Sequence, residues 1–213
     1  MIWNNKVLFL HVPKTAGMSM TEFLLKALPD KVFITGPYEE KTTQKVRYLT
    51  GKRHETMYDA ESFFTYRNTS IFSFEKIFSV MRNPYDLELS RYTYLKKNLP
   101  QDRGPAQTIA TSSDFKTYLK KAPFFGMTPP RLDLYYHFNG QLPQNLVILK
   151  FESLEKSIAK NLSAYLDKNI ALPLENTSKH RHYKEIYDME MEQLCYERHK
   201  WFFEKGFYLR EDF

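Results

Sequence analysis

A short basic loop near the start of the chain combines the residue types that bind an anion. Residues 11–19 read HVPKTAGMS and follow the apolar segment VLFL. Gly17 would let the backbone come close to an anion, and the first amide groups of a helix that began there would point toward it. Lys14 adds a full positive charge, and the hydroxyl groups of Thr15 and Ser19 can donate further hydrogen bonds. The loop therefore predicts a site for a phosphate or a sulfate group.

The loop differs from the usual ATP-binding and GTP-binding pattern. A Walker A loop reads G-x-x-x-x-G-K-[ST], with the lysine directly after the second glycine. Here Lys14 precedes Gly17 by three positions, and no glycine stands earlier in the loop. This order disfavours a nucleotide-driven motor or a kinase of the usual kind.

A second group of polar residues follows in the segment SVMRNPYDLELSRYTY. Arg82 would end a strand, where its guanidinium can hold phosphate oxygens in a bidentate way. Asn83 can cap the next helix and Pro84 can take its first position. Ser90 would then lie about 9 Å along that helix, at about 1.5 Å per residue. These residue types could reach a phosphate resting beside the helix, and a helix cap with a surface arginine is the alternative.

Apolar periodicity predicts the elements that would position these groups. Strands are expected over residues 6–11, 31–35, 75–81 and 146–151. Helices are expected from residue 18 to Pro29, from 84, from 154, and over 183–205 up to Gly206, with a loop over 99–111. This alternation predicts an α/β fold with three layers around a mainly parallel sheet. Both predicted anion-binding groups follow strands, at the edge where such sheets bind ligands.

The composition narrows the class of protein. The 213 residues predict a single domain, residues 1–213. One cysteine, Cys195, excludes an intrachain disulfide and a cysteine-rich zinc site, and it favours a reducing, cytoplasmic setting. Neither a signal peptide nor an apolar run near the ~20 residues of a membrane span is visible, although contact with a membrane surface stays open. The net charge of +6 favours an anionic partner: nucleic acid, a membrane surface, an acidic polysaccharide or a phosphate-rich cofactor.

The segments PKTAG and SVMRNPYDLELSRYTY together resemble the sulfotransferase superfamily that uses 3′-phosphoadenosine 5′-phosphosulfate, or PAPS. The resemblance implies the P-loop-like sulfotransferase fold. It also implies that the first segment holds the 5′-phosphosulfate, with Lys14 stabilising the leaving group, and that the second holds the 3′-phosphate. The residues so assigned to the cofactor are Pro13, Lys14, Thr15, Ala16, Gly17, Met18, Ser19, Arg82 and Ser90.

Looser resemblances, to the carbohydrate and bacterial members, extend over most of the chain. The segment YLTGKRHETMYDAESFF is similar to their histidine-bearing segment, which implies His54 as the catalytic base, with Glu55 as the next candidate. ILKFESLEKSI and the basic C-terminal segment from TSKHRHYKE onward are also similar. The basic turn in the latter would let Lys179, His180 and Arg181 cover the adenosine or its 3′-phosphate; a solvated basic turn before a helix is the alternative.

Two positions differ from the family pattern. Met18 stands where Thr or Ser is common after the glycine, so one side-chain bond to the phosphosulfate would be missing. Leu87 stands where arginine is common after NPYD, and whether Arg91 compensates is left open.

The resemblance implies sulfuryl transfer to a hydroxyl acceptor, with a carbohydrate or glycolipid expected and variable loops such as 99–111 and 123–131 forming its pocket. No metal is expected, because no ligand spacing such as H-E-x-x-H occurs. The alternatives are a nucleotide-dependent kinase with an atypical phosphate loop and a non-catalytic, basic nucleotide-binding or nucleic-acid-binding protein. A nucleic-acid partner is not expected, because the basic clusters coincide with the presumed cofactor loops.

Overall fold

The computed structural model describes residues 1–29, 31–37, 39–97, 104–124, 126–127, 130–167 and 181–211. The chain divides into two compact units. Unit 1 comprises Met1–Met81 and Leu134–Asn176, and unit 2 comprises Arg82–Asp133 and Thr177–Phe213. Each unit is described by itself, and the single domain over residues 1–213 stays a prediction.

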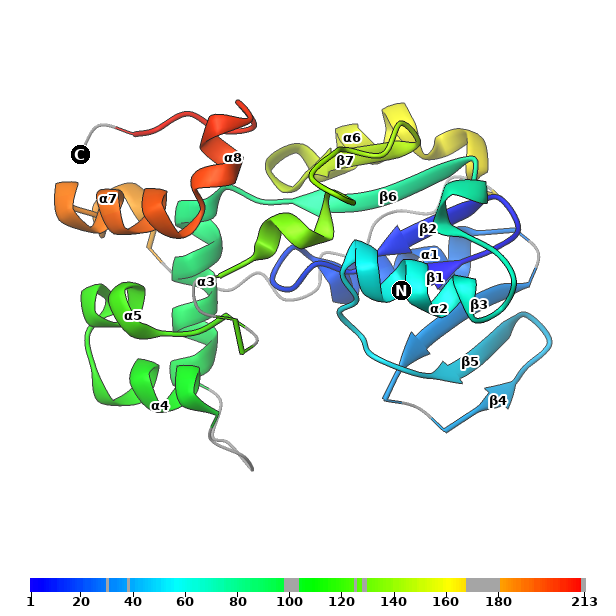
Figure 1. Cartoon of the computed structure of the whole chain (residues 1–213), viewed down its shortest axis with the longest axis horizontal. Coiled ribbons are helices and arrows are strands. Elements are labelled where there is room, and N and C mark those ends of the chain that lie inside the picture. Colours follow the sequence, from blue (N-terminus) through cyan, green and yellow to red (C-terminus); the bar gives the residue numbers. More distant parts are fainter. Residues whose placement is uncertain are drawn as a thin grey trace. The chain divides into compact units, whose positions relative to one another are not determined.

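Unit 1 is built on a seven-stranded sheet with the order β4-β5-β3-β1-β2-β6-β7 (Figure 1). The strands are β1 (Ile2–Trp3), β2 (Val7–Leu10), β3 (Val32–Gly36), β4 (Lys41–Thr42), β5 (Val46–Thr50), β6 (Lys76–Met81) and β7 (Leu146–Lys150). Strands β2, β6 and β7 pair in parallel, as do β3 and β5, while β1 pairs antiparallel with both β2 and β3. The carboxyl ends of β2 and β5 therefore lie at the same edge of the sheet.

Alternating side chains of β2 supply two different cores. Val7 and Phe9 pack with helices α1 (Gly17–Ala27) and α6 (Leu154–Asn161), whereas Leu8 and Leu10 pack with helix α2 (Met57–Thr65). Because neighbouring residues of a strand point to opposite faces, these helices cover opposite faces of the sheet. Figure 1 shows α2 in front of the strands. The predicted α/β fold, with three layers and a largely parallel sheet, is confirmed.

Unit 2 is helical in the residues that the structure describes. It contains α3 (Pro84–Lys97), α4 (Pro105–Ser112), α5 (Phe115–Lys121), α7 (Met189–Arg198) and α8 (Lys200–Glu204). Aromatic rings dominate its core, where Tyr85 and Tyr118 are fully buried beside the thiol of Cys195. Short 3-10 helices complete the two units: η1 (Ile71–Ser73), η2 (Leu132–Tyr135), η3 (Phe151–Ser153), η4 (Ser163–Tyr165) and η5 (Tyr183–Glu185).

All four predicted strands are present, and helix α3 begins at Pro84 as expected, with Asn83 Oδ1 accepting from the amide of Tyr85 at 2.9 Å. The prediction of a loop over residues 99–111 is wrong from residue 105 onward. There Gly104 is the N-cap and Pro105 the first residue of α4, and residues 98–103 lie outside the described residues.

The prediction of one continuous C-terminal helix over 183–205 is also wrong. The segment begins as the 3-10 helix η5 and then forms α7 and α8, which are separated at His199, whose φ of −125° and ψ of 26° are not helical. The chain does end its last helix before Gly206, which has a φ of 72°. Strands β1, β4 and β5 were not predicted.

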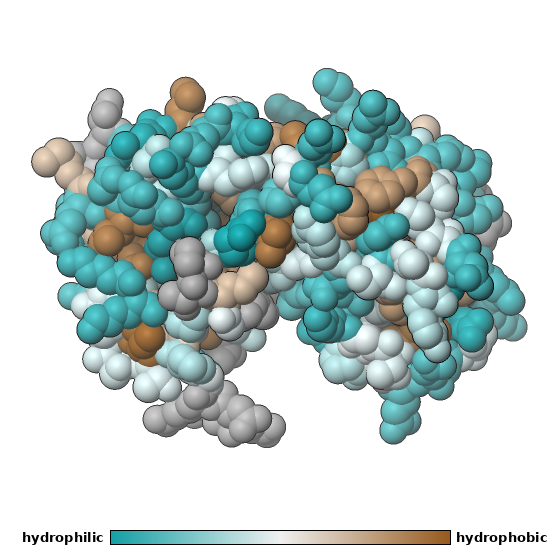
Figure 2. Space-filling model, in the orientation of Figure 1, coloured by the Kyte–Doolittle hydropathy of each residue, from teal (hydrophilic) through white to brown (hydrophobic). Residues whose placement is uncertain are grey.

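The surface seen in Figure 2 is mainly hydrophilic, with hydrophobic residues in small separate groups. In the parts of the chain that the structure describes, no helix combines the length and the apolar character needed to cross a bilayer.

Candidate active site

The loop between β2 and α1 has an unusual backbone. Lys14 has a φ of 64° and Ala16 a φ of 60°, so two residues that carry a Cβ adopt the left-handed conformation. Such conformations cost about 1–3 kcal/mol each and gather at ligand-binding segments. Thr15 between them is fully buried, and its Oγ1 donates to the carbonyl of Val12 at 2.9 Å. The predicted hydrogen bond from the Thr15 hydroxyl to an anion is therefore wrong, because that hydroxyl stabilises the loop; its backbone amide remains a candidate.

Helix α1 begins without the groups that usually satisfy a helix N-terminus. Its N-cap, Ala16, offers no side-chain hydrogen bond, and the first turn carries no acidic residue. In an α-helix the amides of the N-cap and of the first three residues find no carbonyl within the helix. Helix α2 shows the contrast, because Thr56 and Asp59 form a reciprocal capping box at its start. The start of α1 therefore has the features of an anion-binding helix terminus.

The side chains around this helix start differ in exposure. Pro13 and Ser19 are buried and Lys14 is half-buried, whereas Met18 keeps 48% of its surface exposed. Met18 thus offers a thioether at the surface where the family pattern has a hydroxyl.

Gly17 is required by a neighbouring ring. A Cβ atom at Gly17 would lie 1.5 Å from Nε2 of His11, so no other residue fits while His11 keeps its place. His11 is buried, and its burial lowers its pKa well below the usual value, with further lowering by the charges of His54 and Arg53. The close approach predicted at Gly17 is thus made, in this structure, by the His11 ring.

His54 contacts His11 from the turn that follows β5. Its Nδ1 lies 3.1 Å from the His11 carbonyl oxygen, and the two rings are 4.5 Å apart in a T-shaped arrangement. A carbonyl only accepts, so Nδ1 carries the proton and Nε2 of the neutral ring carries the lone pair. Burial lowers the pKa of His54; the hydrogen bond to His11 opposes this shift and the charge of Arg53 adds to it. His54 is therefore neutral near pH 7 and can accept a proton at Nε2.

Glu55, the next candidate base, lies inside unit 1. Its side chain is buried, and Oε2 accepts from the Thr35 hydroxyl at 2.9 Å and from the nitrogen of Met1 at 3.2 Å. These contacts give Glu55 a structural role and favour His54 as the base.

In unit 2, the structure brings together the two predicted phosphate-binding residues. Arg82 Nη1 donates to Ser90 Oγ at 3.1 Å, and its Nε donates to Asp86 Oδ2 at 2.7 Å. Both Arg82 and Ser90 are buried. Eight positions separate the two residues in the sequence, yet their side chains are in contact. This is possible because Arg82 precedes helix α3 and its side chain extends along the first turns of that helix.

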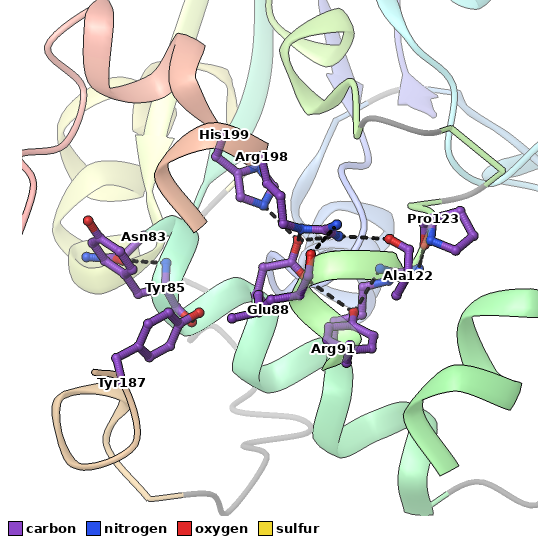
Figure 3. Close-up of polar contacts among 11 residues, drawn as sticks. Asn83, Tyr85, Glu88, Arg91, Ala122, Pro123, Tyr187, Arg198 and His199 are labelled. Atoms are coloured by element: carbon purple, nitrogen blue, oxygen red, sulfur yellow. Dashed lines mark hydrogen bonds and ion pairs between the residues drawn. The ribbon is translucent and has the colours of Figure 1, made fainter. Parts of the chain in front are cut away.

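Arg91 does not occupy the place left by Leu87. Its Nη1 donates to the Tyr118 hydroxyl at 2.8 Å, and its Nη2 donates to the carbonyl of Pro123 at 2.5 Å (Figure 3). Its guanidinium lies over the ring of Phe124. Arg91 is therefore part of the core of unit 2.

Sequence reasoning missed the buried carboxylate on which this core is centred. Glu88 accepts hydrogen bonds from Arg198, from Nε2 of His199 at 2.8 Å and from the Tyr118 hydroxyl at 3.1 Å (Figure 3). Burial alone would raise the pKa of Glu88, but the charge of Arg198 and the hydrogen bond from His199 outweigh it and lower that pKa strongly. No signal in the sequence pairs these residues, because Glu88 and His199 are 111 positions apart.

The last two predicted cofactor residues belong to the C-terminal segment. Lys179 lies outside the described residues, and Arg181 is an exposed residue just before η5. Across the described ranges, no group of three or more His, Cys, Asp or Glu residues could hold a metal ion.

The chain was compared with family models, curated proteins and solved structures. No family model matches the chain, and no curated protein does either. Among solved structures, the chain is similar to the mouse sulfotransferase SULT7A1 complexed with PAP, with 13% sequence identity and a TM-score of 0.47. The match covers 91% of this chain and 64% of that one. The chain thus spans less than two thirds of the protein it matches.

Proposed function

We propose that this chain is a PAPS-dependent sulfotransferase that transfers a sulfuryl group to a hydroxyl group of a carbohydrate or glycolipid. The observation that carries the proposal lies at one edge of the unit 1 sheet. A lysine-bearing, left-handed loop leads there into an uncapped helix, and the neutral ring of His54 packs against His11, which itself packs on the first residue of that helix. Cation, amide donors and base are the groups that in-line sulfuryl transfer needs.

The donor would be held by the loop and the start of α1. PAPS supplies a sulfuryl group joined to a 5′-phosphate through a bridging oxygen. The amides of Thr15, Ala16, Gly17 and Met18, together with Ser19, would bind the 5′-phosphate and the sulfuryl oxygens, and Pro13 would shape the turn. The Lys14 ammonium would stabilise the negative charge that develops on the bridging oxygen as the S–O bond breaks.

His54 would take the proton of the acceptor hydroxyl. As the new O–S bond forms, that proton moves to Nε2, because Nδ1 already donates to the His11 carbonyl. The products are a sulfate ester, 3′,5′-phosphoadenosine (PAP) and a proton, which His54 later releases to water.

The 3′-phosphate would distinguish PAPS from ATP. In unit 2, Arg82 and Ser90 already contact each other and would both donate to that phosphate. Lys179 and Arg181 would add positive charge from the C-terminal segment.

Calorimetric titration with PAP and with ATP tests the proposal. We expect PAP to bind at micromolar concentrations and ATP to bind more weakly. Lys14→Ala should retain the fold and lower the rate of sulfuryl transfer from labelled PAPS by about 100-fold or more, as loss of a transition-state donor does. Binding of ATP without binding of PAP would favour a kinase with an atypical phosphate loop, and unchanged transfer by the Lys14 variant would refute its role.

A further inference from the structure

The guanidinium of Arg53 has no carboxylate partner in the described part of the chain. It lies half-buried in the turn after β5, and its one polar contact there is from Nη1 to the thioether sulfur of Met18, at 3.8 Å. A thioether is a weak acceptor. The preceding residue differs, because Lys52 forms an ion pair with Asp59 at 2.8 Å.

The acidic groups closest in sequence to Arg53 are bound to other residues. Glu55 accepts from Thr35 and from the nitrogen of Met1, and Asp59 accepts from Thr56 and Lys52. The positive charge of Arg53 is thus left available to a ligand, in a turn where the charge of Lys52 is already neutralised.

Arg53 also lies beside the proposed chemistry. It directly precedes the base His54, it contacts Met18 in the first turn of α1, and with Met18 and His11 it lines a small pocket. Its charge lowers the pKa of both His11 and His54 in addition to the larger effect of burial. A hydroxyl delivered to His54 would therefore bring the neighbouring groups of the acceptor against this guanidinium.

We infer that Arg53 binds an anionic group, a carboxylate or a sulfate ester, which the acceptor carries close to the hydroxyl that is sulfated. This inference rests on the proposed function and narrows its substrate class to acidic saccharides. The planar guanidinium matches both groups in bidentate geometry. An anion bound there would also offset the charge that lowers the pKa of His54, so an acidic acceptor would make His54 a stronger base than a neutral one would.

Two acceptors that differ only in charge test the inference. Methyl β-D-glucuronide and its C6 amide share their three hydroxyl groups, and only the former carries a carboxylate. We expect kcat/KM to be at least about tenfold higher for the glucuronide, as one charge-assisted interaction implies, and we expect Arg53→Gln to remove most of this ratio. Methyl β-D-galactoside 6-sulfate and the neutral methyl 6-O-methyl-β-D-galactoside form the second pair, which shows which anion is preferred.

Arg47→Gln is the matched control. Arg47 is an exposed residue of β5, the strand that precedes the turn of Arg53, and its substitution changes the charge equally. It should leave the ratio as it is, whereas a general effect of positive charge would lower the ratio in both variants and overturn the inference. Equal use of the charged and neutral sugars by the unchanged protein would overturn it as well.

A binding measurement separates this inference from the proposed function. The pKa of His54, followed by NMR in the presence of PAP, should rise when methyl β-D-glucuronide is added and should not change with its neutral C6 amide or in Arg53→Gln. If PAP does not bind, the proposed function fails. If PAP binds and the pKa of His54 does not change when the glucuronide is added, the inference about Arg53 fails while the proposed function stands.

Discussion

The ring of His11 lies where any side chain at Gly17 would begin. Gly17→Ala should therefore push this ring away and destabilise the fold by about 1–3 kcal/mol, as overpacking does. His11→Ala leaves space instead, so the double variant should be more stable than the sum of the two single effects predicts, by about 0.5–3 kcal/mol. Urea unfolding of the three variants measures this coupling, and strictly additive effects would contradict the contact.

The neutral state of His54 predicts the pH dependence of transfer. Since burial and the charge of Arg53 lower its pKa, protonation should stop the proposed transfer only below the usual histidine value of about 6.5. The acidic limb of kcat/KM should lie there, and Arg53→Gln should move it to higher pH, because removing a positive charge favours the protonated ring. His54→Gln should lower kcat by about 10²–10⁴-fold and remove the limb. A limb that persists in His54→Gln would assign it to another group.

The residue types of this site could be predicted from the sequence, but their contacts could not. Lys14 and Arg82 follow strands in short motifs, so their positions are local information. The contact of His11 with Gly17 depends on a left-handed turn at residues that are not glycine, which no propensity indicates. The role of Arg53 depends on which nearby acids are already bound, and this follows only from the folded chain.

At the scale of elements, Glu88 connects helix α3 to the end of helix α7. This carboxylate is fully buried and bonds to Arg198 and His199, so Glu88→Gln should destabilise the protein by about 3–5 kcal/mol, the cost of breaking a buried ion pair from one side. The folded-state pKa of Glu88 lies below its unfolded value of about 4.3. Its contribution is therefore present above pH ~4.3 and is lost as the pH falls further, and the variant should lack this loss.

Glu190→Gln is the control for this prediction. Glu190 forms ion pairs with Lys116 and Lys120 at the surface, so its substitution should change stability little. Thermal unfolding of both variants at pH 7 and pH 3 measures the difference. Equal stability of the two variants would show that the buried network contributes nothing.

The elements that sequence reasoning found and missed differ in where their stability comes from. Strand β6 is a mostly apolar segment, KIFSVM, and α3 has a proline at its first position, so both are encoded locally. Strand β1 has two residues and exists because it pairs with β2 and β3. Helices α7 and α8 are separated at His199, where a side chain bonds to Glu88 far away in the sequence, and local periodicity carries no information about that bond.

At the scale of the whole molecule, the proposed function assigns the two phosphate groups of PAP to two segments of the chain, one around Lys14 and one with Arg82 and Ser90. PAP and AMP differ only by the 3′-phosphate, so they separate the two sites. A ligand at 100 times its Kd stabilises the folded state by about 2.7 kcal/mol. We expect Lys14→Ala to reduce the rise in Tm caused by both ligands. Arg82→Ala and Ser90→Ala should reduce only the additional rise caused by PAP.

The two substitutions at the proposed 3′-phosphate site differ in how much they disturb the fold. Arg82→Ala also removes the hydrogen bond to Asp86, so it can lower the stability of the fold. Ser90→Ala removes only a hydroxyl group and therefore tests the 3′-phosphate site without that loss. Equal Tm values with PAP and AMP in the unchanged protein would refute the assignment of Arg82 and Ser90 to the 3′-phosphate.

The burial of Cys195 has a practical consequence. It is the one cysteine of the sequence, it is fully enclosed, and burial raises the pKa of its thiol well above the usual value. A maleimide dye should therefore not react with the native chain, and it should label any cysteine engineered on the surface. A fluorophore introduced at a chosen surface position would then report on that site alone, with no need to remove a native thiol first.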